Sequence, residues 1–310
     1  AYFFLAKAYE GVNEYRLASD AYQNYLNALP GVLDSEILEM QGDALMKAGD
    51  PAAAKNSYVL AAAKAVPANV ESLEIKAAQA SSAAGDDADA IARYLALYDS
   101  STTDYIKAQV NLLLGRIYLQ QGMPEQAYAR FQDSVIQYPR FYDTYSGLVA
   151  LVEGDQPVDD LLRGIVDYYA GQHGYAVAAL DNYMLQYPDH EGTPHYYKAL
   201  SLWNMADYEG EIAEWDRLIE EHPTDKLLAK AYLEKSTTQW TYLEDYEGSA
   251  NTLLHYVARY PDAPESANYL FIAGKIYEIG GYLTKAAATW QRVFNEYPGA
   301  EDSYSALFKT

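Results

Sequence analysis

The sequence predicts an all-α protein, a right-handed αα-superhelix built from about eight helical hairpins. The first observation is a series of helix stops, in which an aromatic or apolar residue precedes proline. Proline ends a helix because it lacks an N–H group and restricts the residue before it. The steps between stops cluster near 37 residues, as from Pro261 to Pro298. The stops are Leu29-Pro30, Val66-Pro67, Tyr138-Pro139, Tyr187-Pro188, His222-Pro223, Tyr260-Pro261 and Tyr297-Pro298, with Tyr98-Asp99 filling one gap.

The second observation is a small residue that is followed by a ring four positions later, upstream of the stop. The pairs are Ala18/Tyr22, Ala54/Tyr58, Ala127/Phe131 and Ala286/Trp290. Because residues at i and i+4 share one helix face, the small residue lets the preceding helix approach and the ring covers the gap. Glycines within residues 48–50, 121–123 and 279–281 mark the ends of the preceding helices. Helix, short turn, helix and proline stop together predict a repeated αα-hairpin.

The 310 residues are expected to form a single α-solenoid, with an irregularity in the middle. Residues 1–139 hold the first repeats, and residues 161–310 hold the remaining ones, of which the last is truncated. The step from Pro139 to Pro188 is long (188 − 139 = 49 residues), and its excess predicts one extra helix at 141–152. We interpret residues 140–160 as this extra helix and a kink in the solenoid, not as a domain boundary.

Composition excludes several classes of partner. The chain has 44 acidic and 22 basic residues, a net charge of −22, which repels the phosphates of nucleic acids and anionic lipids. No apolar run approaches the ~20 residues of a membrane span, so no membrane insertion is expected. The absence of cysteine excludes disulfides and thiolate metal sites. The 32 tyrosines suit thin helical layers, in which a ring packs while its hydroxyl stays near water or a partner.

The segment 267–298 resembles a tetratricopeptide repeat. Other units match more loosely, and Glu211 takes the place of the small residue in one of them. The resemblance implies stacked helical hairpins whose first helices line a binding groove. The matching positions are Leu270, Ala273, Gly274, Tyr277, Ala286, Trp290, Val293 and Pro298.

Two stretches invite a chemical interpretation. Residues 163–188 gather a histidine, aspartates, an arginine and tyrosines, but Tyr175, Ala178 and Tyr187-Pro188 are repeat landmarks, which favours a structural unit. The run HEGTPH separates His190 and His195 by five positions, whereas a zinc protease needs an i, i+4 pair on one helix. Gly192 and Pro194 interrupt that helix, so we interpret the run as a loop. His222 and His255 are expected to have no histidine neighbour, and we predict no metal site and no cofactor.

No catalytic motif stands out, since the sequence has no phosphate-cradling glycine loop, no G-x-S-x-G elbow and no cysteine nucleophile. We therefore expect no enzyme in this chain. Residues 141–310 are also similar to the helical superhelix that precedes the catalytic domain of bacterial soluble lytic transglycosylases. That resemblance implies a non-catalytic scaffold in peptidoglycan turnover, an exported protein of the bacterial periplasm or cell envelope, and a catalytic domain beyond Thr310. The family's catalytic Glu-Ser pair is followed by a Gly-Leu-Met-Gln-type run, which follows neither Glu71-Ser72 nor Glu265-Ser266.

The alternative is a free-standing tetratricopeptide adaptor of the envelope or the cytoplasm, which holds protein or peptide partners in its groove, and a direct glycan binder is a third class. The expected ligands are protein segments or peptidoglycan strands. The groove aromatics chosen as binding residues are Tyr168, Tyr196 and Trp240. Tyr168 and Tyr196 each belong to a Tyr-Tyr pair, in which one ring must face away from the core. Tyr9, Tyr118 and Tyr277 match signature core positions and are interpreted as packing residues.

Overall fold

The computed structural model describes residues 1–307 and 309, and in this part of the chain every regular element is a helix. The chain divides into two compact units, Ala1–Val158 and Asp159–Thr310. The boundary falls inside the stretch 140–160 in which a kink was expected. A single solenoid over all 310 residues stays a prediction.

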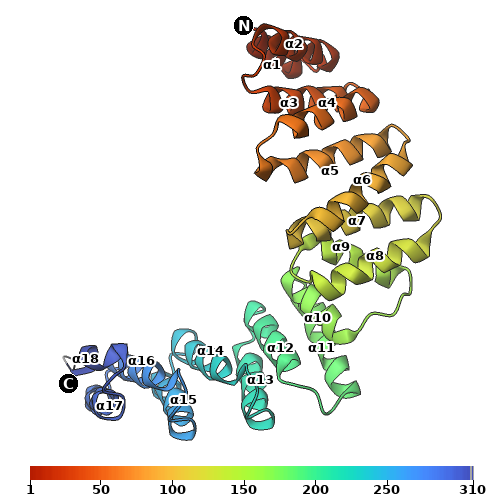
Figure 1. Ribbon diagram of the computed structural model, residues 1–310. Coiled ribbons are helices and arrows are strands. Elements are labelled where there is room, and N and C mark those ends of the chain that lie inside the picture. The colour runs from red at the N-terminus through yellow and green to blue at the C-terminus, as the bar shows by residue number, and fades with distance from the viewer. Residues whose placement is uncertain (308, 310) are drawn as a thin grey trace. The chain divides into compact units, whose positions relative to one another are not determined.

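The first unit contains four helical hairpins and one further helix, and consecutive helices pack side by side (Figure 1). The additional helix, α9, lies where the sequence predicts an extra helix. The helices are α1 (Tyr2–Gly11), α2 (Tyr15–Ala28), α3 (Asp34–Lys47), α4 (Pro51–Lys64), α5 (Pro67–Ala83), α6 (Asp87–Ser100), α7 (Asp104–Gln120), α8 (Pro124–Gln137) and α9 (Tyr142–Glu153).

The second unit repeats the plan with four more hairpins and a short last helix (Figure 1). The αα-solenoid architecture and the expected number of about eight hairpins are therefore confirmed for the described residues. The helices are α10 (Asp160–Tyr169), α11 (His173–Gln186), α12 (Thr193–Asn204), α13 (Tyr208–Glu221), α14 (Leu228–Thr241), α15 (Tyr246–Arg259), α16 (Ser266–Ile279), α17 (Leu283–Glu296) and α18 (Glu301–Leu307).

The turn inside each hairpin is built in the same way, with one residue in the left-handed region. Gly49, between α3 and α4, has φ +77°, a conformation that glycine adopts without steric cost. Ala206 takes the same place between α12 and α13 with φ +60°. In these two hairpins the following residue caps the second helix: Asp50 accepts a hydrogen bond from the backbone N–H of Ala53 (3.2 Å), and Asp207 caps α13 in the same way.

The core is a series of close contacts between the two helices of each hairpin. Gly115 on α7 faces the ring of Phe131 on α8, and Gly274 on α16 faces the indole of Trp290 on α17. Both rings are almost fully buried. The small residues that the sequence predicts on the same helix faces as these rings, Ala127 and Ala286, are also buried. Each hairpin thus buries its apolar side chains on the helices that neighbour it.

Gly115→Ala is expected to destabilise the protein by about 1–3 kcal/mol, because a Cβ atom there would lie 2.2 Å from Cε1 of Phe131. Urea unfolding followed by far-UV circular dichroism measures the change. The matched control is Gly174→Ala on α11, where no atom lies within 4 Å of the added carbon. Equal effects of the two substitutions would contradict the close packing of α7 on α8.

No helix in the described part of the chain is both long enough and apolar enough to cross a bilayer.

Candidate functional site

Four tyrosines from the first helices of two successive hairpins form one aromatic cluster in the second unit. We call Tyr168 and Tyr169 of α10, with Tyr196 and Tyr197 of α12, the tyrosine patch. The ring of Tyr168 lies 5.1 Å from that of Tyr169 and 5.3 Å from that of Tyr197, centroid to centroid, in edge-to-face arrangements. Tyr196 and Tyr197 are also edge to face, at 5.3 Å. Such pairs are stabilising beyond the area they bury, so the rings are held in fixed orientations.

The members of the patch differ in exposure. Tyr196 is only 8% exposed, and its ring packs edge to face on Trp215 at 5.6 Å. Tyr168 and Tyr197 are half-buried, and Tyr169 is exposed. The hydroxyls of Tyr169 and Tyr197 lie 3.2 Å apart. In each Tyr-Tyr pair one ring is therefore nearer the core than the other, and Tyr169 and Tyr197 offer the larger surface to a ligand.

A cation lies beside the patch. Lys230 of α14 donates a hydrogen bond to the hydroxyl of Tyr196, and its Nζ lies 4.8 Å from the centre of that ring. This hydrogen bond raises the pKa of Lys230, and burial raises the pKa of Tyr168. At neutral pH the neutral hydroxyl of Tyr168, which can donate and accept hydrogen bonds, thus lies in a patch beside a protonated amine.

The third predicted binding residue, Trp240, belongs to a different group of contacts from the tyrosine patch. It is half-buried on α14 and packs against the hydrophobic core of the second unit. The ring pairs that unite the tyrosine patch do not include it. Tyr277 is 3% exposed in the core, in agreement with its interpretation as a packing residue. The structure thus places two of the three predicted residues, Tyr168 and Tyr196, in one cluster, together with Tyr169 and Tyr197, which the sequence prediction left out.

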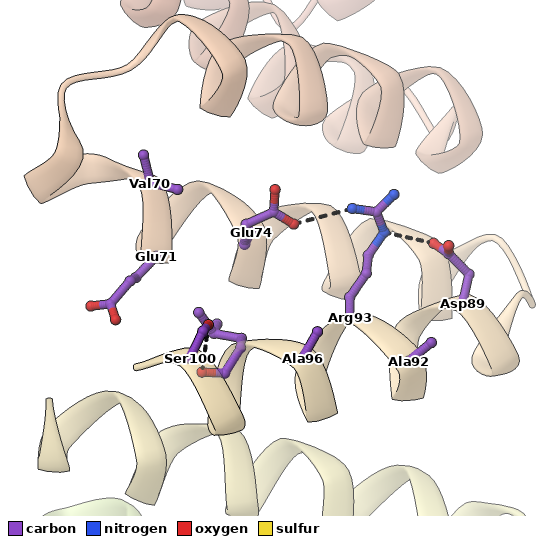
Figure 2. A pocket seen from close by; sticks show the side chains of 9 residues that line it. Val70, Glu71, Glu74, Asp89, Ala92, Arg93, Ala96 and Ser100 are labelled. Atoms are coloured by element: carbon purple, nitrogen blue, oxygen red, sulfur yellow. Dashed lines mark hydrogen bonds and ion pairs between the residues drawn. The ribbon is translucent and has the colours of Figure 1, made fainter. Parts of the chain in front are cut away.

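The first unit contains a hollow of about 520 Å³ between α5 and α6 (Figure 2). Its one cation, Arg93, is already bound: Nη1 lies 3.1 Å from Glu74 and Nε lies 2.8 Å from Asp89. Figure 2 shows this guanidinium held between the two carboxylates. Since its charge is satisfied inside the protein, the hollow offers no free cation to an anionic ligand. It is lined by Val70, Glu71, Glu74, Asp89, Ala92, Arg93, Ala96, Leu97 and Ser100.

The two Glu-Ser pairs have structural partners. Glu71 is near the start of α5 and accepts a hydrogen bond from the hydroxyl of Thr103 (3.4 Å). Glu265 precedes α16 and accepts one from Tyr256 (3.1 Å). Both pairs lie at helix starts, as the sequence indicates.

One hairpin of the chain matches a known repeat family in its sequence. Residues 109–140 match the sequence model of the tetratricopeptide repeat family, and this segment spans most of α7 and all of α8. The search of curated proteins finds no match.

Solved structures that resemble the chain include three tetratricopeptide proteins. One from Parabacteroides merdae has 15% identity and a TM-score of 0.33, covering 89% of this chain and 98% of its own. The C-terminal part of a repeat-containing protein from Cytophaga hutchinsonii has 14% identity and a TM-score of 0.34, covering 98% and 99%. The TPR2AB domain of yeast Sti1, solved as a pHSP90 complex, has 15% identity and a TM-score of 0.33, covering 84% and 98%. The sequence match to the family itself is confined to residues 109–140.

Proposed function

We propose that this protein is a helical-repeat scaffold that binds an extended, basic polypeptide segment through the tyrosine patch. The observation that carries the proposal is the convergence of four tyrosines from two successive first helices on one partly exposed surface. Aromatic rings with hydroxyls supply both apolar area and hydrogen bonds at low conformational cost, and tyrosine is enriched among the residues that dominate binding energy.

The net charge of the chain indicates which kind of polypeptide segment it binds. A net charge of −22 favours encounter with cationic partners and disfavours acidic ones. Arrays of helical hairpins present extended surfaces that suit a polypeptide in an open conformation. The ligand is thus a segment that combines lysine or arginine with apolar side chains.

Binding is tested by titrating the chain with a short, extended peptide rich in lysine and leucine, and with a glutamate-for-lysine version of it. We expect the basic peptide to bind and the acidic one not to bind. Tyr169→Ala and Tyr197→Ala should each weaken binding about tenfold, which corresponds to ~1.4 kcal/mol. The matched control is Tyr175→Ala, an exposed tyrosine on the second helix α11.

Salt separates the two contributions to affinity. At 1 M ionic strength the Debye length falls to about 3 Å, so attraction by charge is lost while ring contacts persist. We expect weaker binding that still depends on Tyr169 and Tyr197. Equal affinity of the Tyr175→Ala and Tyr169→Ala variants for the basic peptide would show that the patch is not the binding surface.

Peptidoglycan strands form the second arm of the same titration. A role in peptidoglycan turnover in the bacterial envelope is the finer proposal that the resemblance to lytic transglycosylases suggests, and tyrosine rings can also stack on sugars. Saturable binding to glycan strands that is lost in Tyr197→Ala, without binding of the basic peptide, would favour that role over the adaptor.

A further inference from the structure

Three of the five histidines meet at one end of the α12/α13 hairpin, and none of them belongs to the tyrosine patch. His190 lies in the loop before α12, His195 in the first turn of α12, and His222 directly after α13. The ring centroids are 5.0 Å apart for His190 and His195, 5.1 Å for His190 and His222, and 5.6 Å for His195 and His222. The expectation that His222 has no histidine neighbour is therefore wrong. His195 and His222 are 27 positions apart (222 − 195), so nothing in the sequence indicated this contact.

The hydrogen bonds of two rings leave the same nitrogen available. Nδ1 of His195 lies 2.7 Å from a carboxylate oxygen of Glu214, and Nδ1 of His190 lies 2.8 Å from the carbonyl oxygen of Glu191. Because both partners are acceptors, each Nδ1 carries a proton, and Nε2 is the nitrogen whose lone pair is available in the neutral ring. Metal-binding histidines have this arrangement, in which the second nitrogen donates to a carboxylate or a carbonyl.

Two histidine nitrogens in this cluster lack a hydrogen-bond partner. Nε2 of His195 and Nε2 of His222 are both buried, and neither has a hydrogen-bond partner among the described residues. His195 as a whole is 3% exposed. Leaving a buried nitrogen unsatisfied is costly, so such an atom calls for an explanation. One nitrogen from each of the three histidines lies within 4.8 Å of the others.

The surroundings hold the rings in place. Glu214 is buried and is itself fixed, because its second oxygen accepts hydrogen bonds from Lys198 (2.8 Å) and Arg217 (2.9 Å). The two loops that carry His190 and His222 are tied together, since the N–H of Gly192 donates to Asp225 (2.8 Å). A surface hollow of about 410 Å³ lies beside His190 and His222 and gives access from solvent.

We propose that His190, His195 and His222 bind a divalent transition-metal ion of the zinc class. Three imidazoles select Zn²⁺, Co²⁺, Ni²⁺ or Cu²⁺ over Mg²⁺ and Ca²⁺, which prefer oxygen ligands. The fourth position falls to a water or to Glu221, whose carboxylate lies 3.8 Å from Nε2 of His195 and is 57% exposed. The bound ion links the loop before α12 to the end of α13.

The rings need only a small adjustment to hold the ion. Bonds of about 2.1 Å to zinc place the ligand atoms of a tetrahedral site about 3.4 Å apart. The present spread of up to 4.8 Å therefore closes by roughly 1.4 Å. His190 and His222 are half-buried, so rotation of their side chains supplies this movement while His195 stays fixed by Glu214.

The test is a titration of the whole chain, free of any polyhistidine tag and stripped with a chelator, with Co²⁺ alone. Excess Mg²⁺ in the buffer occupies the many surface carboxylates. We expect one Co²⁺ per chain, with the visible absorption of a tetrahedral nitrogen-ligated ion, and displacement of that ion by Zn²⁺. His190→Gln and His222→Gln should each weaken binding by at least about tenfold. The control is His255→Gln, an exposed histidine of α15, which should bind as the unsubstituted chain does.

A thermal measurement checks the same site without spectroscopy. An ion that binds only the folded chain raises its melting temperature. Zn²⁺ should raise it for the unsubstituted chain and for His255→Gln, and not for His222→Gln. His195 is not substituted, because it is buried against Glu214 and its loss would disturb folding.

Two outcomes overturn the proposal. The first is the absence of stoichiometric Co²⁺ binding to the folded chain, in which case His195 serves only as a structural hydrogen-bond partner of Glu214. The second is binding that persists in both the His190→Gln and His222→Gln variants while circular dichroism shows them folded. Persistence would place the ion on carboxylates elsewhere.

Discussion

Trp215→Ala is expected to lower the free energy of unfolding of the second unit by about 3–5 kcal/mol, the largest effect of any single substitution considered for this protein. Trp215 on α13 is fully buried in the core that spans α12 to α18. Its removal leaves a cavity that the surrounding helices fill only in part. Urea unfolding followed by tryptophan fluorescence and far-UV circular dichroism measures the loss.

Part of this loss comes from a hydrogen bond. The indole N–H of Trp215 donates to Glu211 (2.8 Å), a carboxylate that is 2% exposed and whose same oxygen also accepts from the hydroxyl of Thr238 (2.9 Å). Trp215→Phe keeps most of the ring volume and removes the donor, so we expect a loss of about 1–3 kcal/mol from the hydrogen bond alone.

The matched control for the ring is Trp203→Ala on α12, where the side chain is 39% exposed and contacts Tyr242. That variant should lose no more than about 1 kcal/mol. A loss at Trp203 as large as the loss at Trp215 would contradict the assignment of the core to the face of α13 that carries Trp215.

The periodic part of the fold could be predicted from sequence because its causes are local. A proline stops a helix at its own position, and a small residue four places before a ring defines one helix face. These signals located the hairpins and the pairing of Phe131 with the preceding helix, and the structure confirms both. Glu211 shows the limit of the signal. It occupies the place of a small residue, and only the structure reveals that Oε1 of its buried carboxylate accepts hydrogen bonds from Trp215 and Thr238, while Oε2 has no hydrogen-bond partner among the described residues.

The candidate site was harder to predict from the sequence, because the residues that contact one another there come from different helices. The doubled tyrosines indicated that one ring of each pair turns away from the core, and the pattern could not say which. The structure buries Tyr196 and leaves Tyr169 and Tyr197 as the larger contact surface. His222 was missed for the same reason, since its partners belong to a loop and a helix that are distant in sequence. Short-range spacing carries no information on such contacts.

A buried carboxylate gives the second large effect, which depends on pH. Asp167 of α10 is 4% exposed, and its nearest cation, Nε of Arg163, lies 3.7 Å from the carboxylate, too far for a hydrogen bond. Burial raises the pKa of Asp167 to about 6, although Arg163 acts in the opposite direction. The folded chain therefore binds a proton between about pH 4 and pH 6 that the unfolded chain has released.

Asp167→Asn is expected to stabilise the chain at pH 7 and to lose this advantage near pH 4. Since the folded pKa of Asp167 is higher than its unfolded pKa, ionisation opposes folding, and stability from this group falls as pH rises from about 4 through 6. The shift from 3.8 to about 6 corresponds to roughly 3 kcal/mol at pH 7. Asparagine does not titrate, but its amide needs a hydrogen-bond partner, so we expect a gain of about 1–3 kcal/mol.

The measurement is the difference in unfolding free energy between Asp167→Asn and the unsubstituted chain, taken by urea titration at pH 4 and at pH 7. A difference between two chains cancels the effect of the other carboxylates, which titrate in both. Asp189→Asn, in an exposed loop, is the matched control and should change stability by less than about 0.5 kcal/mol at either pH. Destabilisation by Asp167→Asn at pH 7 would mean that the ionised carboxylate stabilises the fold through Arg163, and the assignment of its raised pKa to burial would be wrong.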